Sequence, residues 1–290
     1  MKIDRALLAR IGRLRLSDPG AASGALQGDR RSRAVGGGVT FADHRAYTPG
    51  DDLRHVDWNA YGRLNTLLVR LYNEDRDQVV RIIVDASGSM GVGAKLDHAG
   101  ALAASLALLG LLGRDTVQLA VIGGVGGVKL VEGRDPSALP AMLSTLERTE
   151  PGEACDTRAE LLRAARGSVC DRVFLLSDLL LEDDAQDEAL KALAATGRGR
   201  VLLHVLSEDD LSPPLDDAAR VLDAETGEER VVGGGPEVQA AYAATLAAWR
   251  AGVATRCARR GVRLVPAETR RTPEALLFDS LRRARVVAGR

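Results

Sequence analysis

The sequence is poor in aromatic residues and in cysteine. Aromatic side chains make up 3% of its 290 residues, so leucine, valine, isoleucine and alanine must fill most of the core. Its three cysteines, Cys155, Cys170 and Cys257, are too few and too scattered for a disulfide framework or a zinc cluster. We therefore expect reduced, buried thiols in a cytoplasmic protein.

Long apolar runs and a strong net charge are also missing. The most apolar segment, residues 101–113, is shorter than the ~20 residues that span a bilayer, so it predicts a buried helix. The N-terminus, MKIDRALLARIGRLRL, is too interrupted by charge for a signal peptide. The net charge of −1 provides no general attraction to nucleic acid or to membranes. We expect no integral membrane segment and no nucleic-acid partner.

Charge is nevertheless unevenly distributed along the chain. Residues 1–40 carry eight Lys and Arg against three acids, and residues 250–290 carry eleven Arg against three acids. Residues 207–237 carry ten acids against two Arg. The simpler interpretation is solvated faces and a polar loop, and the alternative is a set of docking surfaces for charged partners.

From residue 79 onward, β-forming apolar runs alternate with helical segments. This alternation predicts an α/β fold with a doubly wound, mostly parallel sheet that helices cover on both faces. The predicted strands are residues 79–85, 116–122, 127–133, 172–178, 200–206 and 262–265. The predicted helices are residues 95–112, 136–148, a segment from about 157, 185–195, 236–260 and 273–285.

Three regions follow from this pattern. Residues 1–38 read as a basic, partly flexible N-terminal arm that extends the core. Residues 39–78 contain a Pro-Gly-Asp turn signal and a predicted strand at 67–72, and we expect them to pack against the core. Residues 79–285 form the α/β domain, and residues 208–235 are predicted to leave it as a hairpin excursion.

The segment VVRIIVDASGSMG, residues 79–91, is a predicted strand that ends in alternating oxygen-bearing side chains, Asp85, Ser87 and Ser89. A nucleophile elbow needs glycine two residues before and two after its serine, and only Ser89 meets half of that pattern. A phosphate loop needs a different glycine spacing, and an aspartyl phosphotransferase usually has a second acid where Ser87 stands. A hydrolase or phosphatase that uses Asp85 or Ser87 remains the alternative function.

A site for a hard divalent cation fits these residues best. Mg²⁺ prefers oxygen ligands, and the three side chains can converge where the strand turns into a helix. A helix N-terminus disfavours a cation, so a second carboxylate is needed, and Asp178 can supply it from the end of RVFLLSD. Thr157, at the predicted start of a helix, can add a hydroxyl. Taken singly, Ser89 and Thr157 are more simply interpreted as helix caps, and Asp178 as an acid in a loop. Taken together at one edge of the sheet, these residues predict a metal site.

The motif DASGS at residues 85–89, with Thr157 and Asp178, resembles the metal-ion-dependent adhesion site of von Willebrand factor A domains. The resemblance implies a Rossmann-type domain in which the serines and the threonine coordinate Mg²⁺, or Mn²⁺, while the carboxylates act directly or through water. It also implies that an Asp or Glu of a client protein completes the coordination. The final helix, here residues 272–285, is the usual moving element in that family.

The segment before this domain carries a second resemblance. Residues 41–63, FADHRAYTPGDDLRHVDWNAYGR, are similar to the signature of a bacterial family called domain of unknown function 58. The matching residues are Phe41, Arg45, Tyr47, Gly50, Asp51, Asp52, Arg54, Asp57, Trp58 and Arg63. Members of this family are typically encoded beside MoxR-type AAA+ ATPases, so the resemblance implies such an ATPase as partner.

The charged residues of this signature have two interpretations. Five of them can pair with one another in a charged collar: Arg45, Asp51, Asp52, Arg54 and Asp57. Trp58 and Tyr47 would then anchor the collar against the edge of the sheet. The alternative is a partner-binding surface, in which an unpaired acid such as Asp52 engages the ATPase.

These inferences predict a cytoplasmic adaptor protein rather than an enzyme. A Mg²⁺ ion held by Asp85, Ser87, Ser89, Thr157 and Asp178 would capture an acidic side chain of a client protein. A MoxR-type ATPase would be the machine that the adaptor recruits or directs.

Overall fold

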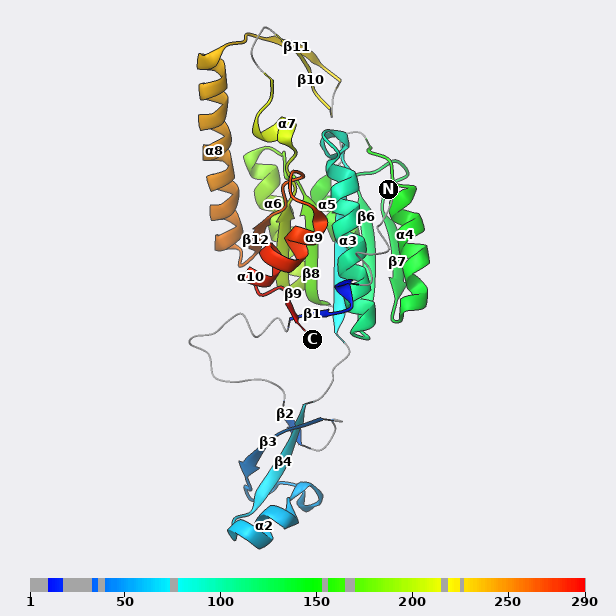
Figure 1. The fold of residues 1–290 in the computed structure, drawn as a ribbon, viewed down its shortest axis with the longest axis vertical. Coiled ribbons are helices and arrows are strands. Elements are labelled where there is room, and N and C mark those ends of the chain that lie inside the picture. Colours follow the sequence, from blue (N-terminus) through cyan, green and yellow to red (C-terminus); the bar gives the residue numbers. More distant parts are fainter. Residues whose placement is uncertain are drawn as a thin grey trace. The chain divides into compact units, whose positions relative to one another are not determined.

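The computed structural model describes residues 10–17, 33–35, 40–73, 78–152, 156–164, 170–214, 219–224 and 227–289. The chain divides into two compact units (Figure 1). The larger unit contains Met1–Ala22 and Gln78–Arg290, and the smaller unit contains Ser23–Asp77.

The larger unit is built on a six-stranded sheet with the order β12-β9-β8-β5-β6-β7. Neighbouring strands pair in parallel, except that β7 returns antiparallel beside β6. The strands are β5 (Val79–Asp85), β6 (Thr116–Ile122), β7 (Lys129–Gly133), β8 (Cys170–Ser177), β9 (Gly197–His204) and β12 (Arg263–Pro266). The predicted strands therefore form this sheet, and the prediction of a mixed α/β fold with a mostly parallel sheet is confirmed.

Helices cover both faces of the sheet, because alternate side chains of each buried strand point to opposite sides. On β5, Val80 and Ile82 belong to one apolar core and Ile83 belongs to the other. The helices of the first core are α3 (Lys95–Leu112), η4 (Pro136–Ala138), α4 (Leu139–Glu147), the π-helical turn η5 (Leu276–Ser280) and α10 (Leu281–Arg283). The short helix α9 (Pro273–Ala275) contacts α3. The helices of the second core are α5 (Thr157–Ala164), α6 (Asp183–Thr196) and α8 (Pro236–Arg259).

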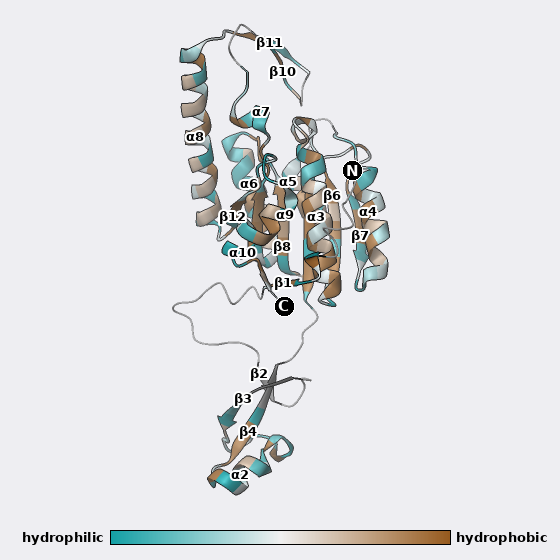
Figure 2. Cartoon of the chain, in the orientation of Figure 1, coloured by the Kyte–Doolittle hydropathy of each residue, from teal (hydrophilic) through white to brown (hydrophobic). Residues whose placement is uncertain are grey.

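Helix α3 is the central helix of the first core, and Figure 2 shows much of it in the colour of apolar residues. Among the described helices it is the one that is long and apolar enough to cross a membrane, and 78% of that stretch is buried inside the protein. The prediction of a buried helix at residues 101–113 is confirmed. Each of its buried leucines contributes about 2 kcal/mol through removal of apolar surface from water.

Both chain ends of the larger unit meet in a small sheet. Strand β1 (Leu14–Leu16) pairs antiparallel with β13 (Val287–Gly289), and Ile11 and Leu14 are buried. Residues 14–16 belong to the predicted N-terminal arm, and residues 287–289 lie after the predicted end of the α/β domain at 285. Both segments nevertheless pack with the α/β core. The rest of the predicted arm lies largely outside the described residues. Cys170 and Cys257 are buried free thiols, as predicted, and Cys155 lies outside the described residues.

The smaller unit is a three-stranded antiparallel sheet with the order β2-β4-β3 and one helix. Its elements are β2 (Arg33–Val35), β3 (Thr40–Ala46), η2 (Leu53–His55), α2 (Trp58–Leu64) and β4 (Leu68–Asn73). Its buried apolar side chains among those described are Val56 and Val69. That residues 39–78 pack against the α/β core stays a prediction.

The predicted excursion begins with a short helix that the sequence did not suggest, α7 (Glu208–Leu211). The chain then forms the antiparallel hairpin of β10 (Ala219–Leu222) and β11 (Glu229–Val232). Figure 1 shows this hairpin beyond the ends of the central strands, on the side of the larger unit where α8 begins.

Candidate metal site

The candidate site lies where the strand order of the sheet reverses. Strands β5 and β8 are neighbours, although β6 and β7 lie between them in the sequence. In open α/β sheets, ligands bind beyond the carboxyl ends of the strands at such a reversal. Asp85 is the last residue of β5 and Asp178 directly follows β8, so the fold brings both predicted carboxylates to this point.

Asp85 is oriented by two hydrogen bonds. The backbone N–H of Ser87 donates to Oδ1 at 3.0 Å, and the hydroxyl of Ser177 donates to Oδ2 at 2.6 Å. Gly123 lies close to this carboxylate, because a Cβ at that position would stand 3.1 Å from Oδ1 and 2.8 Å from the nitrogen of Ser87. Its φ of +73° also favours glycine.

The two serines of the motif lie side by side in the turn after β5. Their Oγ atoms are 3.3 Å apart. Ser87 occupies the N-cap position of the 3₁₀ helix η3 (Gly88–Gly91), but its side chain makes no capping hydrogen bond there. The hydroxyl is thus not needed to begin the helix, and the pair presents two oxygens to one point.

Thr157 is the first residue of α5. The preceding Asp156 accepts a hydrogen bond from the N–H of Ala159 at 2.9 Å, so Asp156 is the residue that caps this helix. Glu160 ties the same helix to the site, because it accepts a hydrogen bond from the N–H of Gly123 at 2.6 Å. Helix α5, which Thr157 begins, is therefore held near Gly123, next to the carboxylate of Asp85.

Asp178 has a partner that the sequence did not predict. Its Oδ2 accepts a hydrogen bond from Nζ of Lys95 at 2.8 Å, and the same ammonium lies 3.0 Å from Oδ2 of Asp210. Lys95 is fully buried at the start of α3. Burial lowers the pKa of Lys95, but Asp178 and Asp210 outweigh that effect and raise it above its ordinary value. The result is a buried cation shared by two acids.

The surroundings of Asp85 disfavour its ionised form. Burial, and then the nearby charge of Asp178, raise the pKa of Asp85 to about 6, while hydrogen bonds from Ser177 and Ser87 oppose the shift. A second positive charge beside Asp85 would stabilise its ionised form. The hydroxyl and carboxylate oxygens present are the donors that Mg²⁺ and Mn²⁺ accept.

A metal could not be held here by acids and imidazoles alone. Within the described part of the chain, no group of three or more His, Cys, Asp or Glu is placed to hold a metal ion. Any ion at this edge of the sheet would therefore depend on the hydroxyls of Ser87, Ser89 and Thr157. This requirement fits the donor set that the sequence predicted, with Lys95 as a competing cation for Asp178.

The signature residues of the smaller unit pair in part as predicted. Arg45 pairs with Asp51 at 2.8 Å, and Arg54 pairs with Asp52 at 2.7 Å. Asp52 is therefore not the unpaired acid that the sequence suggested. The guanidinium of Arg45 holds the pKa of Asp51 well below its usual range, and Arg54 lowers that of Asp52 to about 2.

The other signature residues surround the start of α2. Asp57 caps this helix and bonds to Arg70 at 2.9 Å and His44 at 2.8 Å, rather than to an arginine of the signature. Trp58 is 58% exposed and contacts Tyr61 edge to face, so it is not buried within the smaller unit, and its role as an anchor against the sheet stays a prediction. Gly50 adopts a φ of +107°, Tyr47 is half-buried and Arg63 is exposed, whereas the side chain of Phe41 lies outside the described residues.

Three residues of the site escaped sequence reasoning: Lys95, Ser177 and Asp210. Lys95 stands in GAKLD after the glycine-rich turn, where its spacing from the motif argued against a phosphate site. Its burial is visible only when α3, β8 and α7 are packed together. Asp210 is hidden in an acidic stretch of the sequence that reads as a solvated loop.

The fold and this site define a mixed α/β protein with a cluster of acids and hydroxyls at the switch point of its sheet. The chain belongs to the family described as "Protein of unknown function DUF58", whose sequence profile matches residues 43–252. It is 28% identical to Uncharacterized protein Rv1480 of Mycobacterium tuberculosis strain ATCC 25618 / H37Rv, over 99% of this chain and 93% of that protein. Uncharacterized protein Mb1516 of Mycobacterium bovis matches to the same extent.

Two solved structures are similar to part of the chain. One is the conserved hypothetical protein BatB from Bacteroides thetaiotaomicron, with 16% identity, a TM-score of 0.37 and coverage of 63% of this chain and 98% of BatB. The other is an aerotolerance-related membrane protein from Bacteroides fragilis NCTC 9343, with 15% identity and a TM-score of 0.40. That match covers 71% of this chain and 99% of the other.

Proposed function

We propose that this protein is an adaptor whose von Willebrand factor A-like domain uses a bound Mg²⁺ or Mn²⁺ ion to capture an acidic side chain of a client protein. In this proposal it works in the cytoplasm with a MoxR-type AAA+ ATPase that assembles or remodels client complexes. The observation that supports it is the pair of hydroxyls on Ser87 and Ser89, 3.3 Å apart beside the buried Asp85 at the switch point of the sheet.

Each residue of the site has a distinct task in this proposal. The hydroxyls of Ser87, Ser89 and Thr157 hold the ion without cancelling its charge. Asp85 and Asp178 supply the negative charge that a divalent cation needs, directly or through water. When bound, the ion supplies a positive centre with a coordination position that a client's carboxylate can fill.

The site is better suited to binding than to nucleophilic chemistry. The hydroxyl of Ser87 lies 3.3 Å from another hydroxyl, that of Ser89, and also interacts with the carboxylate of Asp85. Both oxygens of Asp85 already accept hydrogen bonds, which orient the carboxylate but reduce its reactivity as a nucleophile. Turnover of generic ester or phosphoester substrates that Ser87→Ala abolishes would favour a hydrolase instead.

The ATPase part of the proposal rests on membership of the family. The smaller unit offers a surface for such a partner, since Leu53, Trp58, Tyr61 and Leu64 are exposed beside Arg54 and Arg63. Exposed aromatic and arginine side chains are the residue types that contribute most strongly to protein interfaces.

The test compares the wild-type protein with Asp85→Ala and with Asp97→Ala, a matched change at an exposed position of α3. Electron paramagnetic resonance measures Mn²⁺ binding, and capture of a purified MoxR-type ATPase and of client proteins is compared in Mg²⁺ and in EDTA. We expect Asp85→Ala to lose Mn²⁺ binding and Mg²⁺-dependent capture, and Asp97→Ala to retain both. The mechanism would be overturned if the wild-type protein binds no Mn²⁺, or if capture is unchanged both in EDTA and in Asp85→Ala.

A further inference from the structure

The candidate metal site is almost completely covered by the protein itself. The exposed fractions of its residues are 5% for Asp85, 9% for Ser87, 9% for Ser89, 7% for Thr157 and 1% for Asp178. A client's carboxylate could not reach an ion among these side chains without displacing whatever covers them. The residues that cover the site therefore decide when capture takes place.

The hairpin excursion touches the turn that carries the two serines. A Cβ at Gly88, between Ser87 and Ser89, would stand 2.3 Å from the backbone oxygen of Ala224. Ala224 lies in the turn that joins β10 to β11. Gly88 thus has to be glycine because the tip of the hairpin rests directly on it.

The root of the same excursion is fixed to the site. Asp210, on α7, shares the buried Lys95 with Asp178, and the hydroxyl of Tyr242 on α8 donates to the backbone oxygen of Asp210 at 2.8 Å. A Cβ at Gly93 would stand 2.3 Å from the Cβ of Ser207, which begins α7. These contacts hold the base of the hairpin beside the metal site.

Between root and tip, the hairpin is loosely attached. Val221, Leu222 and Val231 are 44%, 63% and 76% exposed, so the strands bury little apolar surface. Segments with few buried contacts open at low free-energy cost. The tip can therefore lift from Gly88 while the root stays in place.

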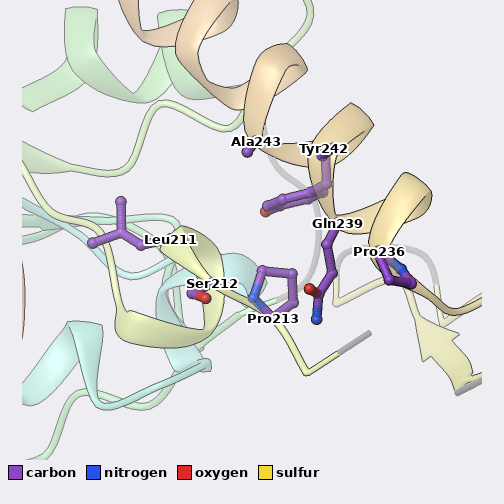
Figure 3. A pocket seen from close by; sticks show the side chains of 8 residues that line it. Leu211, Ser212, Pro213, Pro236, Gln239, Tyr242 and Ala243 are labelled. Carbon is purple, nitrogen blue, oxygen red and sulfur yellow. The ribbon is translucent and has the colours of Figure 1, made fainter. Parts of the chain in front are cut away.

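One connection to the hairpin is suited to a hinge. It is the triple glycine at residues 233–235, where Gly235 has a φ of +119°, because glycine adopts backbone conformations that other residues rarely take. A pocket of about 340 Å³ adjoins the end of this connection, lined by residues 211–213 and by the first turns of α8 (Figure 3). Open space therefore lies where the hairpin rejoins α8.

The chemistry of the hairpin matches the chemistry of the proposed client. Residues 223–230, DAETGEER, which run from the end of β10 into β11, contain four acids and one arginine. The hairpin and a client's carboxylate would therefore both place negative charge near the cation site. A covering segment of this kind would be attracted by the same ion as the client.

We propose that the β10–β11 hairpin is a built-in cover of the metal site, which competes with the client's acidic side chain and lifts at its tip when the client binds. This inference rests on the proposed function, because it needs an ion at Asp85, Ser87 and Ser89. It adds that access to the ion is controlled by the chain's own acidic hairpin, whose root stays fixed through Lys95.

The first experiment removes the cover. Residues 219–232 are replaced by Gly-Ser-Gly-Ser, which can join the ends because Ala219 and Val232 are paired across the hairpin. The control is Val231→Ser, a change at an exposed position that leaves the hairpin intact. Electron paramagnetic resonance measures Mn²⁺ affinity, and proton relaxation of water reports how many water molecules exchange on bound Mn²⁺. The peptide N-acetyl-Gly-Asp-Gly-amide, with one carboxylate, is then titrated as the probe.

We expect the shortened protein to bind Mn²⁺, to show stronger water relaxation, and to bind the peptide about tenfold more tightly than wild type. A cover that is open about one tenth of the time lowers apparent affinity by that factor. Val231→Ser should behave as wild type. If both proteins bind Mn²⁺ but have equal affinity for the peptide, the cover is refuted and the proposed function stands. If neither folded protein binds Mn²⁺, the proposed function fails, and the cover with it.

A second measurement needs no shortened protein. Hydrogen exchange of wild type is followed with Mn²⁺ alone and with Mn²⁺ plus saturating peptide. We expect faster exchange at residues 219–224 and 227–232, with no change at residues 208–211, where the root is fixed. The same peptide should change nothing in Asp85→Ala. Unchanged exchange in the hairpin of wild type under saturation would overturn the proposal even if the shortened protein fails to fold.

Discussion

Replacing Asp85 with asparagine should stabilise the metal-free protein and remove its response to Mg²⁺. Burial, with the nearby charge of Asp178, raises the pKa of Asp85 from 3.8 to about 6. That shift corresponds to a penalty of roughly 3 kcal/mol for the ionised carboxylate at neutral pH. Asparagine has the same shape and can still accept from the N–H of Ser87, while its amide can donate to the hydroxyl of Ser177.

The size of the effect depends on metal and on pH. In EDTA at pH 7, relief of about 3 kcal/mol would raise the melting temperature by roughly 6 to 12 °C for a domain of this size. Mg²⁺ at a hundred times its dissociation constant would stabilise wild type by about 2.7 kcal/mol and leave Asp85→Asn unchanged. Because the folded-state pKa of Asp85 is raised, its penalty exists above about pH 6 and disappears as the pH falls toward 3.8. The advantage of the variant should therefore shrink between pH 7 and pH 5.

The assay is thermal unfolding followed by circular dichroism, in EDTA and in Mg²⁺, at both pH values. Asp97→Asn, at an exposed position of α3, is the matched control and should follow wild type in every condition. A lower melting temperature of Asp85→Asn in EDTA would refute the reasoning about the buried carboxylate. A wild-type protein that gains nothing from Mg²⁺ would refute the metal site.

Three further predictions test the surroundings of the site and the smaller unit. Lys95→Met leaves the buried Asp178 and the half-buried Asp210 without their shared cation, and should cost about 3–5 kcal/mol in urea unfolding; an unchanged midpoint would contradict the pairing. Burial lowers the pKa of His98 from 6.5 to about 4, so the folded state binds fewer protons than the unfolded state between these values, and stability should fall as the pH drops through this window. His98→Leu should remove a fall of roughly 3 kcal/mol in acid titrations of stability, and a variant that keeps the full pH slope would show that other groups cause it. Asp57→Ala removes the cap of α2 and its ion pairs, so hydrogen exchange at residues 58–64 should accelerate while that of the α/β core stays constant.

Much of the architecture could be read from local patterns. The apolar runs at residues 79–85, 116–122 and 200–206 lie in strands that are buried on both faces, and such runs leave little choice of structure. Asp85, Ser87 and Ser89 are close in sequence, so the turn alone brings them together. Asp178 could be placed beside them because parallel strands expose their carboxyl ends at one edge of the sheet.

Long-range approaches could not be read in the same way. The exposure of Trp58 and the pairing of β1 with β13 depend on which surfaces meet, and neither leaves a periodic signal in the sequence. Asp210 and Ala224 stand in a polar, acidic stretch whose composition predicts only solvent exposure.

The sequence by itself determined the class of fold, the turn after β5 and the oxygen-bearing side chains at the edge of the sheet, because strand periodicity and residue spacing act over short distances. Only the tertiary structure decided that Lys95 neutralises Asp178 and that Ala224 rests on Gly88. Both contacts join segments more than eighty residues apart, and they form only when α3, β8 and the hairpin excursion are brought together by the packing of the larger unit.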